Sequence, residues 1–392
     1  MTANLPLATR HFPGSAAMSM LEQLNIGIVG AAGRGGSFRS GIEATGRARI
    51  HAVCDNNAQP LEEAATRLGA VEKYTDYETM LEKSELDAVI LGTPMPLHAP
   101  QAVLALQRNL SVLSEVPAAV SVEECRGLVA ASNASEGIYM MAENYTYMRP
   151  NVLVRELVRR GLFGEVYYGE GEYLHELKEL NEITVWRRKW QTGIRGITYG
   201  THSLGPLAQW FSEGSAGYER VTRVCCEGPG SHHVDPRGDH YADDTSVMLC
   251  KMTGGGLAKI RVDTISDRPH AMTNYQLQGT KGCYESARSR GEKNRIWLAD
   301  IGHAKDEWHN LDELEDEFMP EMWRRPDEAT LQAGHGGGDY FEILDFVRSA
   351  TGEVPTPIGI HEAMDMTLPG LISQESILRD GAWLPVQNSR EW

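Results

Sequence analysis

Residues 24–147 alternate between short apolar runs and stretches with helical spacing of apolar positions. The runs at 26–29, 86–91 and 111–114 are mainly apolar, as strands buried on both faces of a sheet are. Connections between the runs are short. This alternation predicts a doubly wound parallel α/β sheet. We expect strands at 26–29, 50–54, 86–91, 111–114 and 138–141, and helices at 61–68, 75–81, 100–107 and 122–132.

The pattern changes after residue 148. An amphipathic helix is predicted at 149–160, and period-two alternation begins at 166–174. Turn signals such as Gly254–Gly256 separate the later alternating segments, which is typical of a mainly antiparallel α+β domain with an open sheet. We expect its other strands at 221–226, 245–252, 257–264, 275–278 and 295–298, and late helices at 339–349 and 359–379.

Three parts of the chain follow from these patterns. Residues 1–23 form an N-terminal extension, residues 24–147 a Rossmann domain, and residues 148–392 a substrate and oligomerisation domain. A sheet with one face bare of helices favours a homodimer or homotetramer through that sheet.

The first apolar run ends in a glycine-rich turn. A helix that begins there directs unpaired N–H groups and its positive dipole end into the turn, which attracts phosphate. Asp55 ends the second strand roughly 20 residues further on, where it can accept both ribose hydroxyls and repel a 2′-phosphate. The sequence therefore predicts NAD, although a tight strand-to-helix turn without a ligand also fits the glycines. The expected contacts are Gly30, Ala32, Gly33, Arg34, Gly35 and Asp55, with Ala32 at the usual middle glycine and Gly33 taking part of its role.

Polar residues also follow the other predicted parallel strands. Ligands of doubly wound sheets bind beyond the carboxyl ends of the strands, so residues at these ends are expected to share one site. Trp186 and Arg187 lie in a segment that interleaves aromatic and cationic residues, suited to sugar C–H faces and to hydroxyl or anionic groups. Further cofactor contacts are assigned to Thr93, Pro94, His98, Glu115, Val116, Asn144, Trp186 and Arg187.

Composition excludes several classes of function. Apolar content of 41% and charged content of 23% are typical of globular proteins, and the net charge of −17 disfavours nucleic acid and acidic membranes as partners. The six cysteines form no C-x-x-C motif, and no apolar run reaches membrane-spanning length. We expect a cytoplasmic protein. The segment 232–244 contains histidines and aspartates, but their spacing matches no zinc site, so no metal is predicted.

Several of these motifs resemble the Gfo/Idh/MocA oxidoreductase superfamily. The resemblance implies an NAD(P)-binding Rossmann domain, a C-terminal α/β domain that commonly mediates dimers or tetramers, and activity on sugars. It spans nearly the whole chain beyond residue 24. The residues that carry it are the glycine-rich turn, Thr93-Pro94 with His98, Glu115-Val116-Pro117, Gly161–Gly164 and His202.

Two positions depart from ordinary dehydrogenases of this superfamily. Those enzymes carry a lysine where this chain has Val116, and an aspartate where it has Thr198, four residues before His202. Valine cannot support proton transfer from a sugar hydroxyl. Two acid/base groups of the usual dehydrogenase are thus absent together.

A narrower similarity accounts for the departures. Thr201–Gln209 is similar to the Thr-His-Gly-Leu-Gly-Pro segment of glycoside hydrolase family 109, the NAD-dependent α-N-acetylgalactosaminidase group, and residues 115–118, 171–175, 278–282 and 334–340 also resemble that group. The similarity implies that the sugar is oxidised at C3, loses its glycosidic bond by elimination, adds water and is reduced again. Ser203 replaces the family's glycine after the histidine, and residues 195–200 lack the usual Tyr-Pro step, so the exact sugar is not carried over.

Catalytic roles follow from this resemblance. His202 is assigned as base for the oxidised hydroxyl, and Tyr173 as the group that handles the C2 proton, provided that nearby positive charge lowers its pKa. From the residues alone, His202 fits a helix cap or the core nearly as well, and Tyr173 fits a packed aromatic. The small-molecule sugar or glycoside is expected to contact Tyr145, Tyr147, Arg149, His175, Tyr199 and His335; Asp339 suits a helix N-cap as well as a ligand.

Three hypotheses for function remain open. The first is an NAD-dependent glycosidase, and the second is an NAD(H)-dependent sugar or polyol dehydrogenase. The third, a non-catalytic NAD(H)-binding sensor, is disfavoured by the dense Tyr, His, Arg and Trp content after Asn144.

Overall fold

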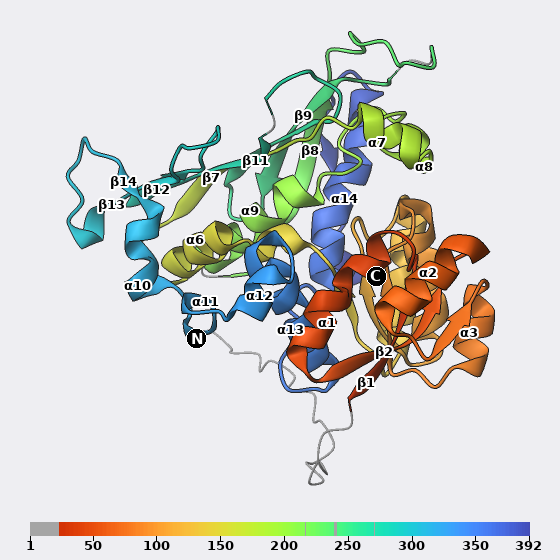
Figure 1. The fold of residues 1–392 in the computed structure, drawn as a ribbon. Helices are drawn as coiled ribbons and strands as arrows, with labels where there is room; N and C mark the ends of the chain where they lie inside the picture. Colours follow the sequence, from red (N-terminus) through yellow and green to blue (C-terminus); the bar gives the residue numbers. More distant parts are fainter. Residues whose placement is uncertain (1–22, 216, 239–240, 270) are drawn as a thin grey trace, which may run out of the picture.

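The computed structural model describes residues 23–392 except 216, 239–240 and 270. It contains a six-stranded and a nine-stranded sheet (Figure 1). The predicted N-terminal extension lies outside the described residues apart from Gln23.

The six-stranded sheet is parallel throughout, with strand order β3-β2-β1-β4-β5-β6. This order reverses direction beside the first strand, as in Rossmann folds. The predicted doubly wound sheet is therefore confirmed. One strand was missed, because β3 has only three residues, none of them fully buried, and so leaves no pattern. The strands are β1 Leu24–Val29, β2 Ala48–Cys54, β3 Glu72–Tyr74, β4 Ala88–Leu91, β5 Ser111–Ser114 and β6 Tyr139–Met141.

Helices cover this sheet, and two of them have side-chain N-caps. Asp76 accepts from the backbone N–H of Thr79, and Ser121 accepts from that of Glu124. The helix predicted after the glycine turn begins as a 3-10 helix before it becomes α-helical. The helices are η1 Arg34–Phe38, α1 Arg39–Thr45, α2 Ala58–Leu68, α3 Tyr77–Lys83, η2 Met95–Leu97, α4 His98–Leu106 and α5 Val122–Ala134.

Three glycines allow the first turn to lie against the end of β4. A Cβ on Gly92 would be 2.3 Å from the backbone nitrogen of Gly35, and a Cβ on Gly30 would be 2.6 Å from the carbonyl oxygen of Gly92. Gly30 also has a φ of +74°, which L side chains rarely adopt. The two loops can therefore touch only without side chains.

The nine-stranded sheet has the order β14-β13-β12-β11-β7-β10-β9-β8-β15. The β10·β7 pair is parallel and the others are antiparallel, so the predicted mainly antiparallel sheet is confirmed. Short strands were missed because two to four residues carry too little alternation. The strands are β7 Val166–Leu174, β8 Val221–Glu227, β9 Thr245–Met252, β10 Leu257–Asp263, β11 Met272–Gly279, β12 Gly282–Glu285, β13 Arg295–Leu298, β14 His309–Asn310 and β15 Leu384–Pro385.

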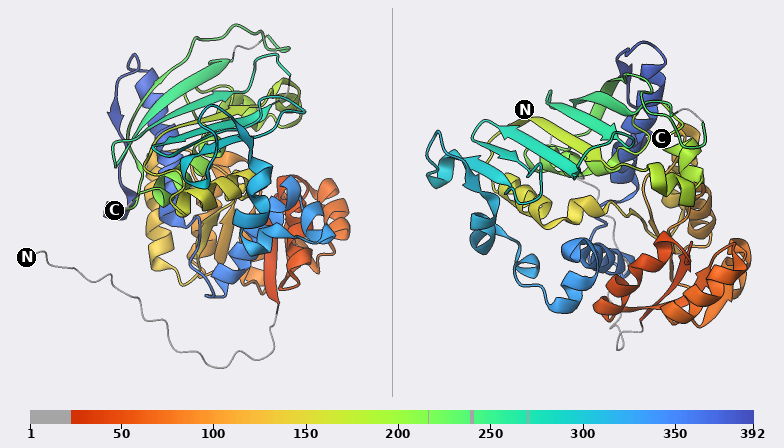
Figure 2. Two further views of the ribbon diagram at one scale, coloured as in Figure 1. Left: turned by 90° about the vertical axis from the view of Figure 1, so that its left-hand side faces the viewer. Right: turned by 45° about the horizontal axis from the view of Figure 1, so that its top comes forward.

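The remaining helices follow β6. They are η3 Asn144–Tyr147, α6 Arg149–Arg159, α7 Lys178–Ile183, α8 Trp186–Trp190, α9 Thr201–Glu213, η4 Ala299–Ile301, η5 Leu311–Leu314, α10 Glu315–Phe318, α11 Glu321–Arg324, α12 Glu328–Gln332, η6 His335–Gly337, α13 Gly338–Ala350, α14 Ile360–Ile377 and η7 Ser389–Glu391. Helix α9 packs against β7, β10 and β11, and α14 against β8. Figure 2 shows these helices on the side of the sheet that faces the N-terminal part. The oligomer predicted through the opposite face stays a prediction.

Two late helices join the C-terminal part to the Rossmann sheet. Helix α13 lies beside α1 (Figure 1), where a Cβ on Gly41 would be 3.1 Å from Cγ1 of Ile343. Helix α14 packs on α5 and β6, and Thr367 accepts from the backbone N–H of Ala118 at 3.3 Å. The end of the chain therefore contributes to both cores, and the predicted boundary between residues 147 and 148 stays a prediction.

All six cysteines are thiols without a disulfide. Within the described ranges, no helix combines the length and apolar character needed to cross a lipid bilayer.

The loop contact at Gly92 gives a stability prediction. Gly92→Ala should lower the free energy of unfolding by about 1–3 kcal/mol, because the added methyl overlaps the backbone at Gly35. Urea unfolding followed by circular dichroism measures the change. The matched control is Gly127→Ala in α5, where a Cβ meets nothing within 4 Å, and this change should stabilise by about 0.5–1 kcal/mol. Equal effects of both substitutions would contradict the packing argument.

Candidate active site

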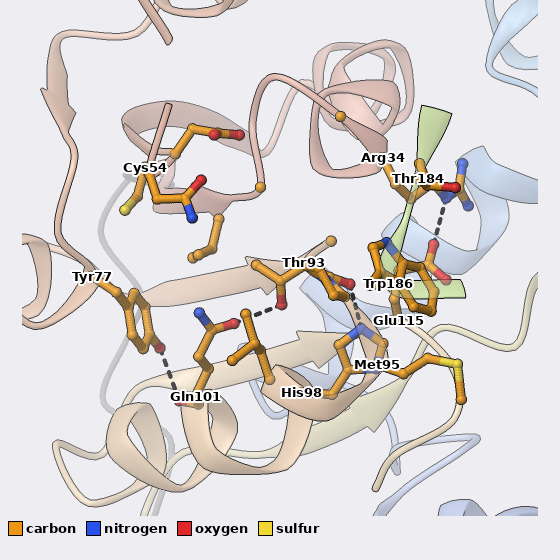
Figure 3. Close-up of a pocket in the computed structure, with 18 of the residues that line it drawn as sticks. Arg34, Cys54, Tyr77, Thr93, Met95, His98, Gln101, Glu115, Thr184 and Trp186 are labelled. Atoms are coloured by element: carbon orange, nitrogen blue, oxygen red, sulfur yellow. Dashed lines mark hydrogen bonds and ion pairs between the residues drawn. The ribbon is translucent and has the colours of Figure 1, made fainter. Parts of the chain in front are cut away.

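A cavity of about 540 Å³ lies at the carboxyl ends of the parallel strands. Its walls come from both parts of the chain, since Thr184, Trp186 and Arg187 near α8 face the loops that follow β1, β2, β4 and β5 (Figure 3). This is where doubly wound sheets bind ligands. Of the predicted site residues, the cavity is lined by Gly30, Gly33, Arg34, Asp55, Thr93, Pro94, His98, Glu115, Val116, Trp186, Arg187 and Tyr199.

Gly33 and Asp55 fit the dinucleotide. A Cβ on Gly33 would meet only the carbonyl oxygen of Gly30, at 3.7 Å, so packing within the protein does not require a glycine there. Close approach of a pyrophosphate to the backbone does require a glycine at this position. Asp55 accepts from the backbone N–H of Ala32 at 3.1 Å and from that of Asn57 at 3.1 Å, which holds its carboxylate beside the turn. Both observations match what NAD needs at these positions.

Arg34 connects the glycine turn to the loop after β5. Its Nε lies 2.5 Å from Oε1 of Glu115, and its Nη1 lies 4.0 Å from Oδ2 of Asp339. Burial opposes the charge of the guanidinium, but Glu115 and Asp339 outweigh burial and raise the pKa of Arg34. A fixed cation thus lies at the cavity wall, next to the phosphate end predicted from the glycines.

His98 holds two cavity loops in place. Its ring nitrogens lie 2.9 Å from the carbonyl oxygen of Pro117 and 2.7 Å from that of Thr93, and burial lowers its pKa. Figure 3 shows the Thr93 contact beside the hydrogen bond from Thr93 Oγ1 to Gln101. The nitrogens face backbone, so the contribution of His98 to a cofactor site is the shape of these loops.

Beside the cavity, the side chain of His202 is paired with a buried carboxylate. His202 Nδ1 lies 2.7 Å from Oε1 of Glu143, whose residue is fully buried. A carboxylate accepts, so Nδ1 carries the hydrogen and Nε2 keeps the lone pair that a base uses. His202 is the second residue of α9.

Two glycines bring α9 close enough for this pair. A Cβ on Gly205 would be 2.8 Å from Cγ of Glu143, and a Cβ on Gly171 of β7 would be 2.0 Å from the carbonyl oxygen of Ser203. The helix therefore lies tightly between η3 and β7. Tyr275 adds a hydrogen bond to the carbonyl oxygen of His202 at 2.5 Å.

Three tyrosines surround His202. The ring centroids of Tyr145, Tyr199 and Tyr173 lie 4.0, 5.1 and 5.3 Å from that of His202. Tyr199 also lines the cavity, so His202 and Tyr173 lie one side chain from it rather than in its wall.

Tyr173, near the end of β7, is hydrogen-bonded to His175, which directly follows the strand. Its hydroxyl lies 2.7 Å from Nδ1 of His175. Burial raises the pKa of Tyr173, and nearby Arg187 opposes this shift. The hydroxyl therefore keeps its proton in the protein by itself, at hydrogen-bond distance from His175.

His335, from η6, lies at the other side of Tyr145, with ring centroids 6.1 Å apart. Its Nδ1 lies 2.8 Å from Oδ1 of Asp339 and 3.3 Å from Nδ2 of Asn144. Asp339 is therefore not an N-cap, since α13 begins without a side-chain cap and the carboxylate binds the histidine.

Some predicted residues do not reach the cavity. Ala32 contributes its backbone N–H to Asp55, Gly35 packs against Gly92, and Asn144 contacts His335, so none of the three is in the cavity wall.

Two predicted substrate residues have other partners. The hydroxyl of Tyr147 donates to Asp345 at 3.0 Å, and Arg149 pairs with both carboxylate oxygens of Glu315. These two side chains lie at the junction with α10 and α13. Their partners are distant in the sequence, so no local pattern predicts these contacts.

Glu143 is the main residue that sequence reasoning missed. Its signal was its place after β6, beside Asn144, at the edge of the sheet where ligands bind. From the sequence alone, a glutamate at this position is expected to be exposed to solvent. In the structure, α9 packs against it.

The acidic and histidine-rich segment around residue 235 forms ion pairs. His233 Nδ1 lies 2.9 Å from Asp244, and Asp235 pairs with Arg188 at 2.6 Å. Among the residues whose positions are described, no group of three metal-ligating side chains converges. Asp239 and His240 lie outside that set.

Comparison with known proteins identifies the class of protein first. Residues 24–143 match the oxidoreductase family with an NAD-binding Rossmann fold. Levoglucosan dehydrogenase, solved with NADH and levoglucosan, is similar over 93% of this chain and 100% of its own, with a TM-score of 0.75 and 19% identity. The WlbA dehydrogenase from Bordetella pertussis, solved with NADH and UDP-GlcNAcA, is similar over 93% of this chain and 98% of its own, with a TM-score of 0.72 and 21% identity. At these identities the likeness shows the fold, and the protein is an NAD-binding member of the Gfo/Idh/MocA group.

The second part of the chain narrows this class. Residues 147–388 match the glycosyl hydrolase 109 C-terminal domain. A glycosyl hydrolase family 109 protein from Saccharopolyspora erythraea is 30% identical over 92% of this chain and 82% of its own. The alpha-N-acetylgalactosaminidase from Shewanella oneidensis is 27% identical over 91% of this chain and 83% of its own. The chain therefore belongs to glycosyl hydrolase family 109, as the resemblance predicted.

The cofactor contacts give a binding prediction. Asp55→Ala should weaken NAD⁺ binding about 10- to 100-fold, because a charged acceptor for the ribose hydroxyls is lost. The preference for NAD⁺ over NADP⁺ should fall as well. Calorimetric titration measures both affinities. Asp300→Ala, an exposed aspartate on η4, is the control and should bind NAD⁺ as the wild type does. Unchanged affinity in Asp55→Ala would refute the ribose contact.

Proposed function

We propose that the protein is an NAD-dependent glycoside hydrolase whose cycle consists of transient oxidation at C3, elimination, water addition and reduction. One observation carries the proposal: a buried His202–Glu143 pair adjoins an NAD cavity that has Val116, and no lysine, in its wall after β5. A base is therefore available beside the cavity, but not at the position that ordinary dehydrogenases use.

Asp55 would hold the ribose of NAD⁺, and Gly33 and Arg34 its phosphates. The cofactor, when bound, would supply a reversible hydride acceptor for C3. The net reaction is hydrolysis, with no change in the total amount of oxidised cofactor.

His202 removes the proton of the C3 hydroxyl as the hydride leaves. Glu143 keeps the hydrogen on Nδ1, so Nε2 accepts the proton, and the ionised carboxylate stabilises the imidazolium that forms. The same imidazolium returns the proton when the C3 carbonyl is reduced. No net proton has to leave the site for this step.

Tyr173 and His175 handle the C2 proton, which the C3 carbonyl makes acidic. Burial raises the pKa of Tyr173, so a free phenolate is unfavourable. The 2.7 Å hydrogen bond offers another route: the tyrosine oxygen accepts the C2 proton while its own proton moves to His175. The C1–O bond breaks and its electron pair leaves with the aglycone oxygen, which takes a proton from solvent. Water then adds its oxygen at C1 and releases one proton to solvent, while the proton held by Tyr173 and His175 returns to C2.

An NAD(H)-dependent sugar dehydrogenase is the alternative, and it is favoured by the fold shared with levoglucosan dehydrogenase. The two functions differ in whether NADH accumulates. Val116 argues for the glycosidase, because the proton relay of the usual dehydrogenase is missing.

The deciding experiment incubates the purified protein with nitrophenyl glycosides, including the α-N-acetylgalactosaminide, with and without added NAD⁺. Nitrophenol release that requires catalytic NAD⁺, without growing NADH absorbance, is the expected result. Steady formation of NADH from free sugars, with no cleavage of any glycoside, would replace the proposal with the dehydrogenase.

The proposal also predicts the behaviour of the base. His202→Ala should lower kcat by at least about 10²-fold, because the hydroxyl proton has no acceptor, while NAD⁺ affinity stays near the wild-type value. Glu143→Gln should lower kcat by a similar factor of about 10²-fold, because an amide no longer stabilises the imidazolium. Steady-state kinetics and calorimetry separate these effects. Near-normal kcat in either variant would mean that another group is the base.

A further inference from the structure

Glu342 lies on the face of α13 that packs against η3. Asp339, three residues before it, binds His335, and Asp345, three residues after it, accepts from Tyr147 of η3. Residues three apart share one face of a helix, so Glu342 lies between these two contacts and beneath the site.

This glutamate is fully buried, and neither carboxylate oxygen has a hydrogen-bond partner among the described residues. Buried charges normally have a partner, because leaving water costs several kcal/mol. Arg34, the cation that acts on Glu342, is already shared by Glu115 and Asp339. Glu342 is therefore a buried acid without a counter-charge.

The groups around Glu342 come from every neighbouring element of the site. Asp339 lies on α13, Glu115 after β5, Arg34 in η1 and Glu143 at the start of η3. Burial, then Asp339 and Glu115, raise the pKa of Glu342 well above its ordinary value, and Arg34 opposes them only in part. Burial without a hydrogen-bond partner among the described residues favours the protonated form of this side chain.

Glu143 presents the complementary gap. Its Oε1 holds His202, but its buried Oε2 has no hydrogen-bond partner in the described structure. A carboxylate can only accept, whereas a protonated carboxyl can donate. A protonated Glu342 can therefore donate the hydrogen bond that Oε2 of Glu143 lacks, and Oε2 of Glu143 can accept it.

We propose that Glu342 is a positioning residue that retains a proton and donates it in a hydrogen bond to Oε2 of Glu143, directly after a side-chain rotation or through one enclosed water molecule. This hydrogen bond orients Glu143 so that its Oε1 faces Nδ1 of His202. The catalytic consequence rests on the proposed function; the proton on Glu342 does not.

The stability test uses Glu342→Gln and the near-isosteric Glu342→Met. In the unfolded chain a glutamate has a pKa of about 4.3, so above that pH folding of the wild type must take up a proton. Both variants remove this cost. Their melting temperature should exceed that of the wild type at pH 8, and the difference should shrink as the pH falls toward 4. A difference that does not depend on pH would overturn the proposal.

Infrared spectroscopy tests the proton itself. The carbonyl stretch of a protonated carboxylic acid, which is distinct from that of a carboxylate, should be present at neutral pH and weaker in Glu342→Gln. Glu123→Gln, an exposed glutamate in α5, is the control and should leave that band unchanged. An unchanged band in Glu342→Gln would show that Glu342 is ionised and would overturn the proposal.

Kinetics test the positioning role. Glu342→Gln keeps a neutral donor and should retain kcat within about threefold, whereas Glu342→Met should lower kcat about tenfold or more with KM unchanged, as expected for a supporting hydrogen bond. Equal kcat values in the two variants would refute the role at Glu143. If the wild type cleaves no glycoside, the proposed function fails, while the melting and infrared results still decide the state of Glu342.

Discussion

The site depends on one buried contact between two parts of the chain, the hydrogen bond from His202 to Glu143 at 2.7 Å. A fully buried carboxylate is tolerated only with a partner, so the imidazole stabilises the fold as well as being the proposed base. Gly205 and Gly171 make the contact possible, because a Cβ at either position would overlap η3 or α9. Helix α9 is therefore held at the distance that the hydrogen bond between His202 and Glu143 requires.

Charge is distributed unevenly around this contact. Glu115, Asp339 and Glu143 each have a cationic or imidazole partner, whereas Glu342 has none within the described part of the chain. A buried acid without a partner destabilises a protein at neutral pH, and such groups are found mainly where function uses them. The Rossmann loops, η3 and α13 all contribute to this cluster, so cofactor binding and the catalytic pair share one electrostatic environment.

The fold and the chemistry of this protein support different comparisons. The fold is shared with sugar dehydrogenases at about one fifth sequence identity, which defines architecture and little else. Membership of glycosyl hydrolase family 109 covers both parts of the chain, and Val116 agrees with it because proton transfer cannot occur at that position. The site therefore separates the protein from ordinary dehydrogenases that have the same sheets and the same cofactor.

The sequence by itself determined the parallel sheet, the glycine turn, Asp55 and the mainly antiparallel second sheet, because these depend on local periodicity and on short, regular spacings. It also singled out His202 and Tyr173, but only through resemblance to a family. Only the tertiary structure decided which groups they meet. Glu143, His202 and Glu342 are distant in sequence and come together because α9 and α13 pack on η3. Tyr147 and Arg149 were directed elsewhere by the same packing, since nothing local in a sequence records which distant carboxylate a side chain will face.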